Sequence, residues 1–104
     1  MTFLFGYSGN SIERVAEVIT STLNVQPELR ESSFRGGDYW LYSDGDERAT
    51  LQRNNDGGPP NEPAEDAFGE WPVLLYVEAG KEGGIIAKLM QSTIQPTFLC
   101  MRKF

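Results

Sequence analysis

The sequence predicts an α+β protein with a single mostly antiparallel sheet of about five or six strands and two helices packed on one face. The expected order along the chain is β-α-β-β-β-loop-β-α-β. Two segments have apolar residues at helical spacing, which is too few helices for a doubly wound sheet. The other ordered segments are short apolar or aromatic runs between Gly- and Asp-rich turns, as in antiparallel hairpins.

A strand and a helix are expected first. Phe3–Phe5 is a short apolar run that suits a buried strand. The helix should run from about Ser11 to Leu23, with Asn10 as its N-cap and Glu13 three residues later, as in a capping box. Its apolar face consists of Ile12, Val15, Ala16, Ile19 and Leu23.

The pattern changes to strands from Leu29 to Arg53. LRESSF, YWLYS and RATLQRN are the three expected strands, and Asp44-Gly45 is the expected hairpin tip between the last two. Alternation puts Tyr39 and Trp40 on opposite faces, so one of the two should be exposed or nearly so.

The C-terminal part supplies a strand, a helix and a strand. WPVLLYVEA is the most apolar run and should be a central strand, and TFLCMRKF should be the last strand, holding Leu99, Cys100 and Met101 in the interior. Between them IIAKLMQ should form a short helix. Its expected buried side consists of Ile85, Ile86, Leu89 and Met90.

An acidic Pro/Gly-rich loop, residues 54–70, interrupts this pattern. Pro59-Pro60 and Pro63 exclude a regular helix or ladder across its first half. A long loop in a compact domain is commonly functional or disordered. We treat residues 1–104 as a single domain that contains this loop, because the length suits one hydrophobic core.

The negative charge is concentrated in one third of the chain. The net charge is −6, and residues 38–70 carry nine acids against two arginines, which gives −7 and leaves +1 for the rest. Charge of one sign in one region steers association with oppositely charged partners, although acidity can also serve solubility alone. Direct nucleic-acid binding is not expected, because clustered Lys and Arg residues are missing.

Several chemistries are excluded by composition. The chain has no histidine, which removes Ser-His and Cys-His catalysis and His-ligated zinc. The single cysteine, Cys100, cannot form a disulfide within the chain. The segment 43–47 resembles the start of a calcium loop but lacks its later glycine and glutamate. We therefore expect no cofactor, no metal and no enzyme activity, with a carboxylate-based enzyme or ligand-binding domain kept as an alternative.

A cytoplasmic location is expected. The first residues, MTFLFGYSGNS, have no basic region before a short apolar run, unlike a signal peptide. The sequence has no run near the ~20 apolar residues of a membrane span.

Aromatic residues lie among the acids, and Tyr and Trp are enriched at binding hot spots. The alternative is that these aromatic residues belong to the core. The expected partner-binding residues are Asp38, Tyr39, Trp40, Asp44, Asp46, Glu47, Asp56, Glu62, Glu65, Asp66 and Glu70.

In arrangement the chain resembles small acidic immunity proteins of contact-dependent growth inhibition and related polymorphic toxin systems. The resemblance lies in an N-terminal strand and helix, then GGDYWLY, ATLQRNND, an acidic loop, WPVLLYVEA and a closing LCMRKF strand. It implies an inhibitor that binds a cognate toxin domain one-to-one, such as a nuclease with a basic active-site cleft. A generic adaptor subunit of a larger complex, with a more apolar interface, is the other interpretation.

Overall fold

The computed structural model describes residues 2–32, 37–54, 65, 68–80 and 83–102. The described residues form the predicted α+β fold, a six-stranded antiparallel sheet with two helices. Its elements are β1 (Thr2–Tyr7), α1 (Ile12–Leu23), β2 (Glu28–Ser32), β3 (Gly37–Asp44), β4 (Glu47–Arg53), β5 (Val73–Glu78), α2 (Gly84–Leu89) and β6 (Thr97–Arg102).

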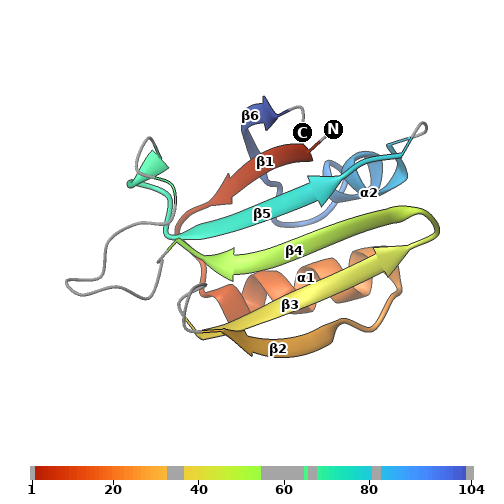
Figure 1. Ribbon diagram of the computed structural model, residues 1–104, viewed down its shortest axis with the longest axis horizontal. Helices are drawn as coiled ribbons and strands as arrows, with labels where there is room; N and C mark the ends of the chain where they lie inside the picture. The colour runs from red at the N-terminus through yellow and green to blue at the C-terminus, as the bar shows by residue number, and fades with distance from the viewer. Residues whose placement is uncertain (1, 33–36, 55–64, 66–67, 81–82, 103–104) are drawn as a thin grey trace.

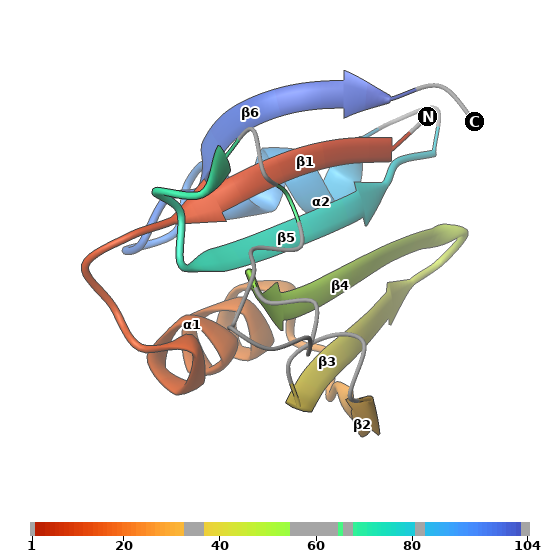
Figure 2. The same cartoon turned by 60° about the vertical axis from the view of Figure 1, so that its left-hand side comes forward.

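The strands lie in the order β2-β3-β4-β5-β1-β6, and every neighbouring pair is antiparallel. The most apolar strand, β5, lies between β4 and β1, so the prediction of a central strand is confirmed. Both helices cover the same face of the sheet (Figures 1 and 2). The other face, called the second face below, is lined by the alternate residues of each strand.

The N-cap of helix α1 lies one residue later than predicted. Ser11, not Asn10, is the N-cap, and its Oγ accepts a hydrogen bond from Arg14 N at 3.1 Å. Glu13 is therefore not part of a capping box, and its carboxylate pairs with Arg53 instead. Asn24 ends the helix in the left-handed conformation, with φ 54°.

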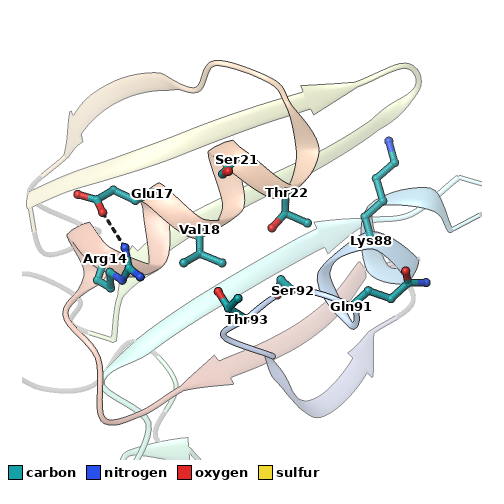
Figure 3. Close-up of a pocket in the computed structure, with 9 residues that line it drawn as sticks. All are labelled: Arg14, Glu17, Val18, Ser21, Thr22, Lys88, Gln91, Ser92 and Thr93. Atoms are coloured by element: carbon teal, nitrogen blue, oxygen red, sulfur yellow. Dashed lines mark hydrogen bonds and ion pairs between the residues drawn. The ribbon is translucent and has the colours of Figure 1, made fainter.

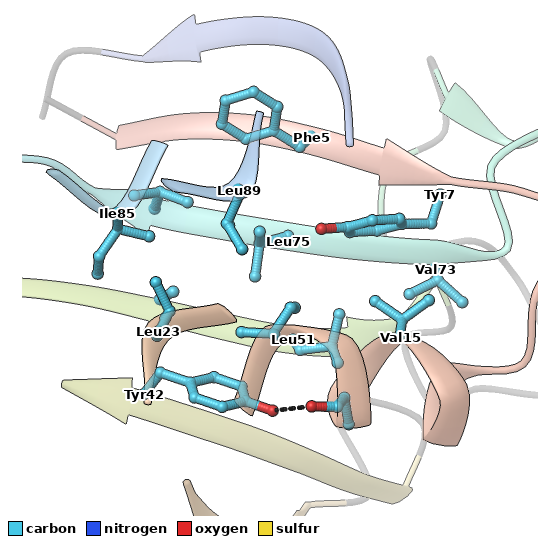
Figure 4. Close-up of a cluster of buried hydrophobic side chains, with 14 of the residues drawn as sticks. Phe5, Tyr7, Val15, Leu23, Tyr42, Leu51, Val73, Leu75, Ile85 and Leu89 are labelled. Atoms are coloured by element: carbon cyan, nitrogen blue, oxygen red, sulfur yellow. Dashed lines mark hydrogen bonds between the residues drawn. The ribbon is translucent and has the colours of Figure 1, made fainter. Parts of the chain in front are cut away.

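The core lies between the helices and the sheet (Figure 4). Tyr42 crosses it from β3, and its hydroxyl donates to Ala16 O at 3.0 Å and lies 3.1 Å from Thr20 Oγ1. The hydroxyl of a second core tyrosine, Tyr7, has no hydrogen-bond partner among the residues that the structure describes. Within the described part of the chain, the Tyr42 hydroxyl is therefore hydrogen-bonded and the Tyr7 hydroxyl is not.

Two predicted interior positions are wrong. Met90 is the C-cap of α2 and is exposed, because it lies four residues after Ile86, on a side of the helix that is itself only partly buried. Met101 is 50% exposed, because β6 is an edge strand and the helices cover only part of its inner face.

The second face of the sheet is also partly covered. Leu4 and Leu74 point to this face, and both are fully buried. The indole of Trp71 packs directly against Gly6, where a Cβ atom would lie 2.7 Å from Trp71 Cδ2. The chain that leads into β5 therefore lies against this face, and only glycine fits beneath it.

Candidate functional site

The clearest concentration of charge is at one end of the sheet, where β2 and β4 end and β3 and β5 begin. We call it the acidic end. Glu31, Asp38 and Glu70 are exposed there, and none of them forms an ion pair with another described residue. It lies on the left of Figure 1, on the same side as the start of α1.

Arg53 is the basic residue that the structure places among these carboxylates. Its guanidinium donates to Asp38 O at 3.3 Å and to Glu13 Oε1 at 3.2 Å. The ion pair with Glu13 joins α1 to β4 and balances one of four carboxylates. A shallow hollow of about 530 Å³ lies beside it, between the start of α1 and the segment before β5. The described residues of the acidic end therefore keep an excess of negative charge, whereas the hollow beside them is lined by the Glu13–Arg53 pair and by neutral side chains.

Asn54 joins the two ends of the acidic loop at this same place. Its side-chain amide donates to Phe68 O and Trp71 O, each at 2.9 Å, and its Oδ1 accepts from Glu65 N at 2.9 Å. Its backbone N–H donates to Pro72 O at 2.9 Å. Asn54 and Glu65, the described residues on either side of 55–64, are thus joined directly to each other, and Asn54 is also bonded to the residue before β5.

Glu65 provides the second attachment. Its Oε2 accepts from Tyr76 OH and from Arg102 Nη1, each at 2.9 Å, and its Oε1 accepts from Arg102 Nη2. The guanidinium, with help from the phenol, lowers the pKa of the Glu65 carboxyl, and the carboxylate raises the pKa of Arg102 in turn. Since the side chain is only 13% exposed, Glu65 holds the loop to β5 and β6 and is not free for a partner.

The opposite end of the sheet carries the hairpin between β3 and β4. Asp44 pairs there with Lys88 Nζ at 3.0 Å, and Asp46 is exposed. Glu47 is only 5% exposed, and its carboxylate accepts from Gly80 N at 2.6 Å and Ile85 N at 2.8 Å. Glu47 therefore supplies the cap that α2 lacks at Gly83 and has no face toward a partner.

The aromatic pair of β3 lies on opposite faces, as predicted, but both residues are half-buried. Trp40 packs at the margin of the core and lines a groove of about 500 Å³ beside α1. Tyr39 lies on the second face and forms a side-chain hydrogen bond with Arg30. The two residues cannot belong to one flat contact area.

Apart from Tyr39 and Trp40, the structure therefore divides the described residues of the predicted partner-binding set, all of them acids, into three groups. Asp38 and Glu70 share the acidic end, Asp44, Asp46 and Glu47 lie at the other end, and Glu65 forms an internal ion pair. Asp56, Glu62 and Asp66 lie outside the described residues. Glu13 and Glu31 join the acidic end although they lie outside the acidic window of the sequence. The order of the elements could have placed Glu13 there from sequence. The helix follows β1 directly, so its first turn lies at the end of the sheet where β1 ends.

A further hollow, of about 660 Å³, lies between α1 and the end of α2 (Figure 3). Its described lining is mostly hydroxyl and amide side chains. The one carboxylate in that lining, Glu17, pairs with Arg14 at 3.1 Å, and Lys88 points away from both. The acid–base pair of this lining is therefore an ion pair whose guanidinium does not release a proton, so the described lining has no arrangement for general acid–base catalysis.

Across residues 2–32, 37–54, 65, 68–80 and 83–102, no group of three or more His, Cys, Asp or Glu side chains could hold a metal ion. Within the same ranges, no helix is long and apolar enough to cross a membrane.

Comparisons with protein-family models, with curated proteins and with solved structures found no match.

Proposed function

We propose that the protein is an immunity-type inhibitor that binds a basic toxin domain through the acidic end and thereby neutralises it in the same cell. One observation carries the proposal. Exposed carboxylates from α1, β2, β3 and the segment before β5 share one end of the sheet with Asn54, whose side chain holds backbone groups of Glu65, Phe68 and Trp71.

The physical basis is electrostatic complementarity. A nuclease binds phosphates through Lys and Arg, so its cleft has the opposite charge to the acidic end. Segregated charge of this kind accelerates encounter and makes the association rate depend on salt. The hydrogen bonds of Asn54 and Glu65 fix these two residues before binding, which lowers the conformational entropy that a contact beside them would cost.

A carboxylate enzyme receives less support from the geometry. A general acid needs a raised pKa, but the Arg102 guanidinium moves the pKa of Glu65 in the opposite direction. The hollows of the described surface are shallow and are lined mainly by neutral side chains or paired charges. We therefore propose binding, not catalysis, as the activity of the acidic end.

The test uses the toxin domain encoded beside this gene, if there is one, as a purified catalytic domain. Binding should be one-to-one, should abolish the toxin's activity, and should have an association rate that falls as salt rises. The variant Glu31→Gln/Asp38→Asn/Glu70→Gln should associate at least about tenfold more slowly at low salt.

The matched control is Glu78→Gln, which removes one exposed carboxylate from the opposite end of β5. It should leave the association rate within about twofold. If the triple variant binds like the wild type, the acidic end is not the contact surface. If binding is tight but indifferent to salt and to all four changes, the generic adaptor interpretation with an apolar interface is preferred.

A further inference from the structure

The two edge strands of the sheet differ in how they are protected. β2 forms one edge and carries Glu28, Arg30 and Glu31, and Pro27 precedes it. Charged side chains and proline are the usual protection of a free edge against pairing with another strand. β6 forms the other edge, and Thr97–Met101 contains no charged residue. The described chain therefore leaves β6 open to strand addition (Figure 2).

A bulge changes which side chains β6 presents. Leu4 pairs with Cys100 while the next residue, Phe5, pairs with Phe98, so Leu99 is an extra residue. In a regular strand Phe98 and Met101 would point to opposite faces. Because of the bulge, Phe98 pairs with Phe5 and Met101 pairs with Phe3. Phe5 and Phe3 both point to the face of the sheet that the helices cover, so Phe98 and Met101 point to that face too.

These two side chains are half-exposed, Phe98 at 52% and Met101 at 50%. The ring of Phe98 packs on Phe5 and Phe3 with centroid distances of 5.8 and 6.3 Å, which leaves its outer side uncovered. The edge therefore offers free backbone groups and, beside them, two apolar side chains on one face.

We propose that β6 pairs in antiparallel orientation with β6 of a second copy of this chain, about a two-fold axis between Leu99 and Cys100. This register places Phe98 opposite Met101 of the second copy, and Met101 opposite its Phe98. Thr97 then faces Arg102 of the second copy, so no like charges meet. The sheet continues across both copies.

Self-complementarity is the reason for choosing a second copy as the occupant. About the two-fold axis, Phe98 of each copy packs against Met101 of the other. The exposed apolar side chains of the edge therefore cover one another, and a different protein is not needed to cover them. Each copy has one such edge, since the opposite edge carries the charges of β2. The contact is therefore isologous and closes at a dimer. The acidic end remains free, so the dimer is independent of the proposed inhibitor function.

The experiment is sedimentation equilibrium of the full chain over a range of concentrations. The mass should rise with concentration and reach a plateau at twice that of one chain. Met101→Lys places a charge on the edge while its stem keeps packing, and it should weaken dimerisation by about tenfold. Leu29→Lys makes the same kind of change on β2, where Leu29 is 59% exposed, and should dimerise like the wild type.

Phe98→Glu tests the register. Alone it should also dimerise weakly, but an equal mixture with Met101→Lys should recover dimers, because the introduced carboxylate of one copy then faces the introduced ammonium group of the other. Circular dichroism of each variant shows whether it is folded. If Phe98→Glu does not fold, Met101→Lys against Leu29→Lys still decides the edge.

Three outcomes would overturn the proposal: a single-chain mass at every concentration, an equal effect of Leu29→Lys and Met101→Lys, or growth past a dimer without a plateau. A chain that is monomeric alone, but whose Met101→Lys variant loses affinity for the toxin domain, would assign the edge to the toxin instead.

Discussion

The Glu65 N–H donates a 2.9 Å hydrogen bond to Asn54 Oδ1, which joins two residues that are eleven positions apart. The same Asn54 amide holds the carbonyls of Phe68 and Trp71. One side chain therefore satisfies three backbone groups from the chain that enters β5. The base of the acidic loop is fixed by this amide, whatever the loop binds.

Replacing Asn54 should destabilise the fold. Asn54→Ala leaves three partly buried backbone groups without their partner, so the free energy of unfolding should fall by about 2–3 kcal/mol. Urea denaturation of the full chain measures the loss. Asn10→Ala is the matched control, because Asn10 is exposed and makes no cap for α1. Equal losses in the two variants would refute the role given to Asn54.

The Glu65–Arg102 pair should make stability depend on pH. Because Arg102 lowers the pKa of Glu65 in the folded protein, the carboxylate adds stability above the unfolded pKa of about 4.3 and loses it as pH falls through the folded pKa. Wild type should therefore be about 1–2 kcal/mol more stable than Glu65→Gln near neutral pH. The difference should shrink in acid, where Glu65 is protonated and resembles glutamine.

Denaturation of both proteins across this pH range checks the prediction. Glu17→Gln is the control, because the Arg14–Glu17 pair lies in solvent and should contribute no more than about 0.5 kcal/mol. A Glu65→Gln difference that is constant with pH would show that the charge of Glu65 is unimportant.

Glu47 should behave as a structural residue. Glu47→Ala removes the acceptor for Gly80 N and Ile85 N, and should cost about 2–3 kcal/mol of stability and loosen α2. Its neighbour Asp46 is exposed, so Asp46→Ala should change stability by less than about 0.5 kcal/mol. Hydrogen exchange of the α2 amides separates the two. Unchanged protection in Glu47→Ala would remove the capping role.

The two core phenols should respond oppositely to loss of the hydroxyl. Tyr7→Phe removes an oxygen that is buried without a described partner, so stability should stay level or rise by up to about 1 kcal/mol. Tyr42→Phe loses the bonds to Ala16 and Thr20 and should cost about 1–2 kcal/mol. Urea midpoints of the two variants give the comparison. A loss in Tyr7→Phe as large as that in Tyr42→Phe would show that the Tyr7 hydroxyl has a stabilising partner.

The local pattern of the sequence predicted the elements well, because each one shows its own periodicity. The apolar stripe of α1, the alternation of β4 and the continuous apolar run of β5 each depend on neighbours within a few residues. The position of the cap, Ser11 against Asn10, was less certain, since both residue types can accept the same hydrogen bond.

The long-range pairs could not be predicted in this way. Glu65 with Arg102 and Glu47 with Ile85 are separated by 37 and 38 positions, and no local pattern couples them. In sequence each acid counted only as part of a charged region. Likewise, Met101 appears in an apolar run that suits an interior strand, and only the strand order shows that it lies at an edge.

The two tryptophans lie on different sides of the sheet, so their intrinsic fluorescence can report on the two sides separately without an added label. Trp71 belongs to the chain entering β5 and packs on Gly6, whereas Trp40 lines the groove beside α1. In a Trp40→Phe variant, the emission spectrum would follow the docking of the loop base alone. Detachment of that base would shift the emission to the red. Its timing relative to binding of the proposed partner would separate a preformed contact surface from one that rearranges.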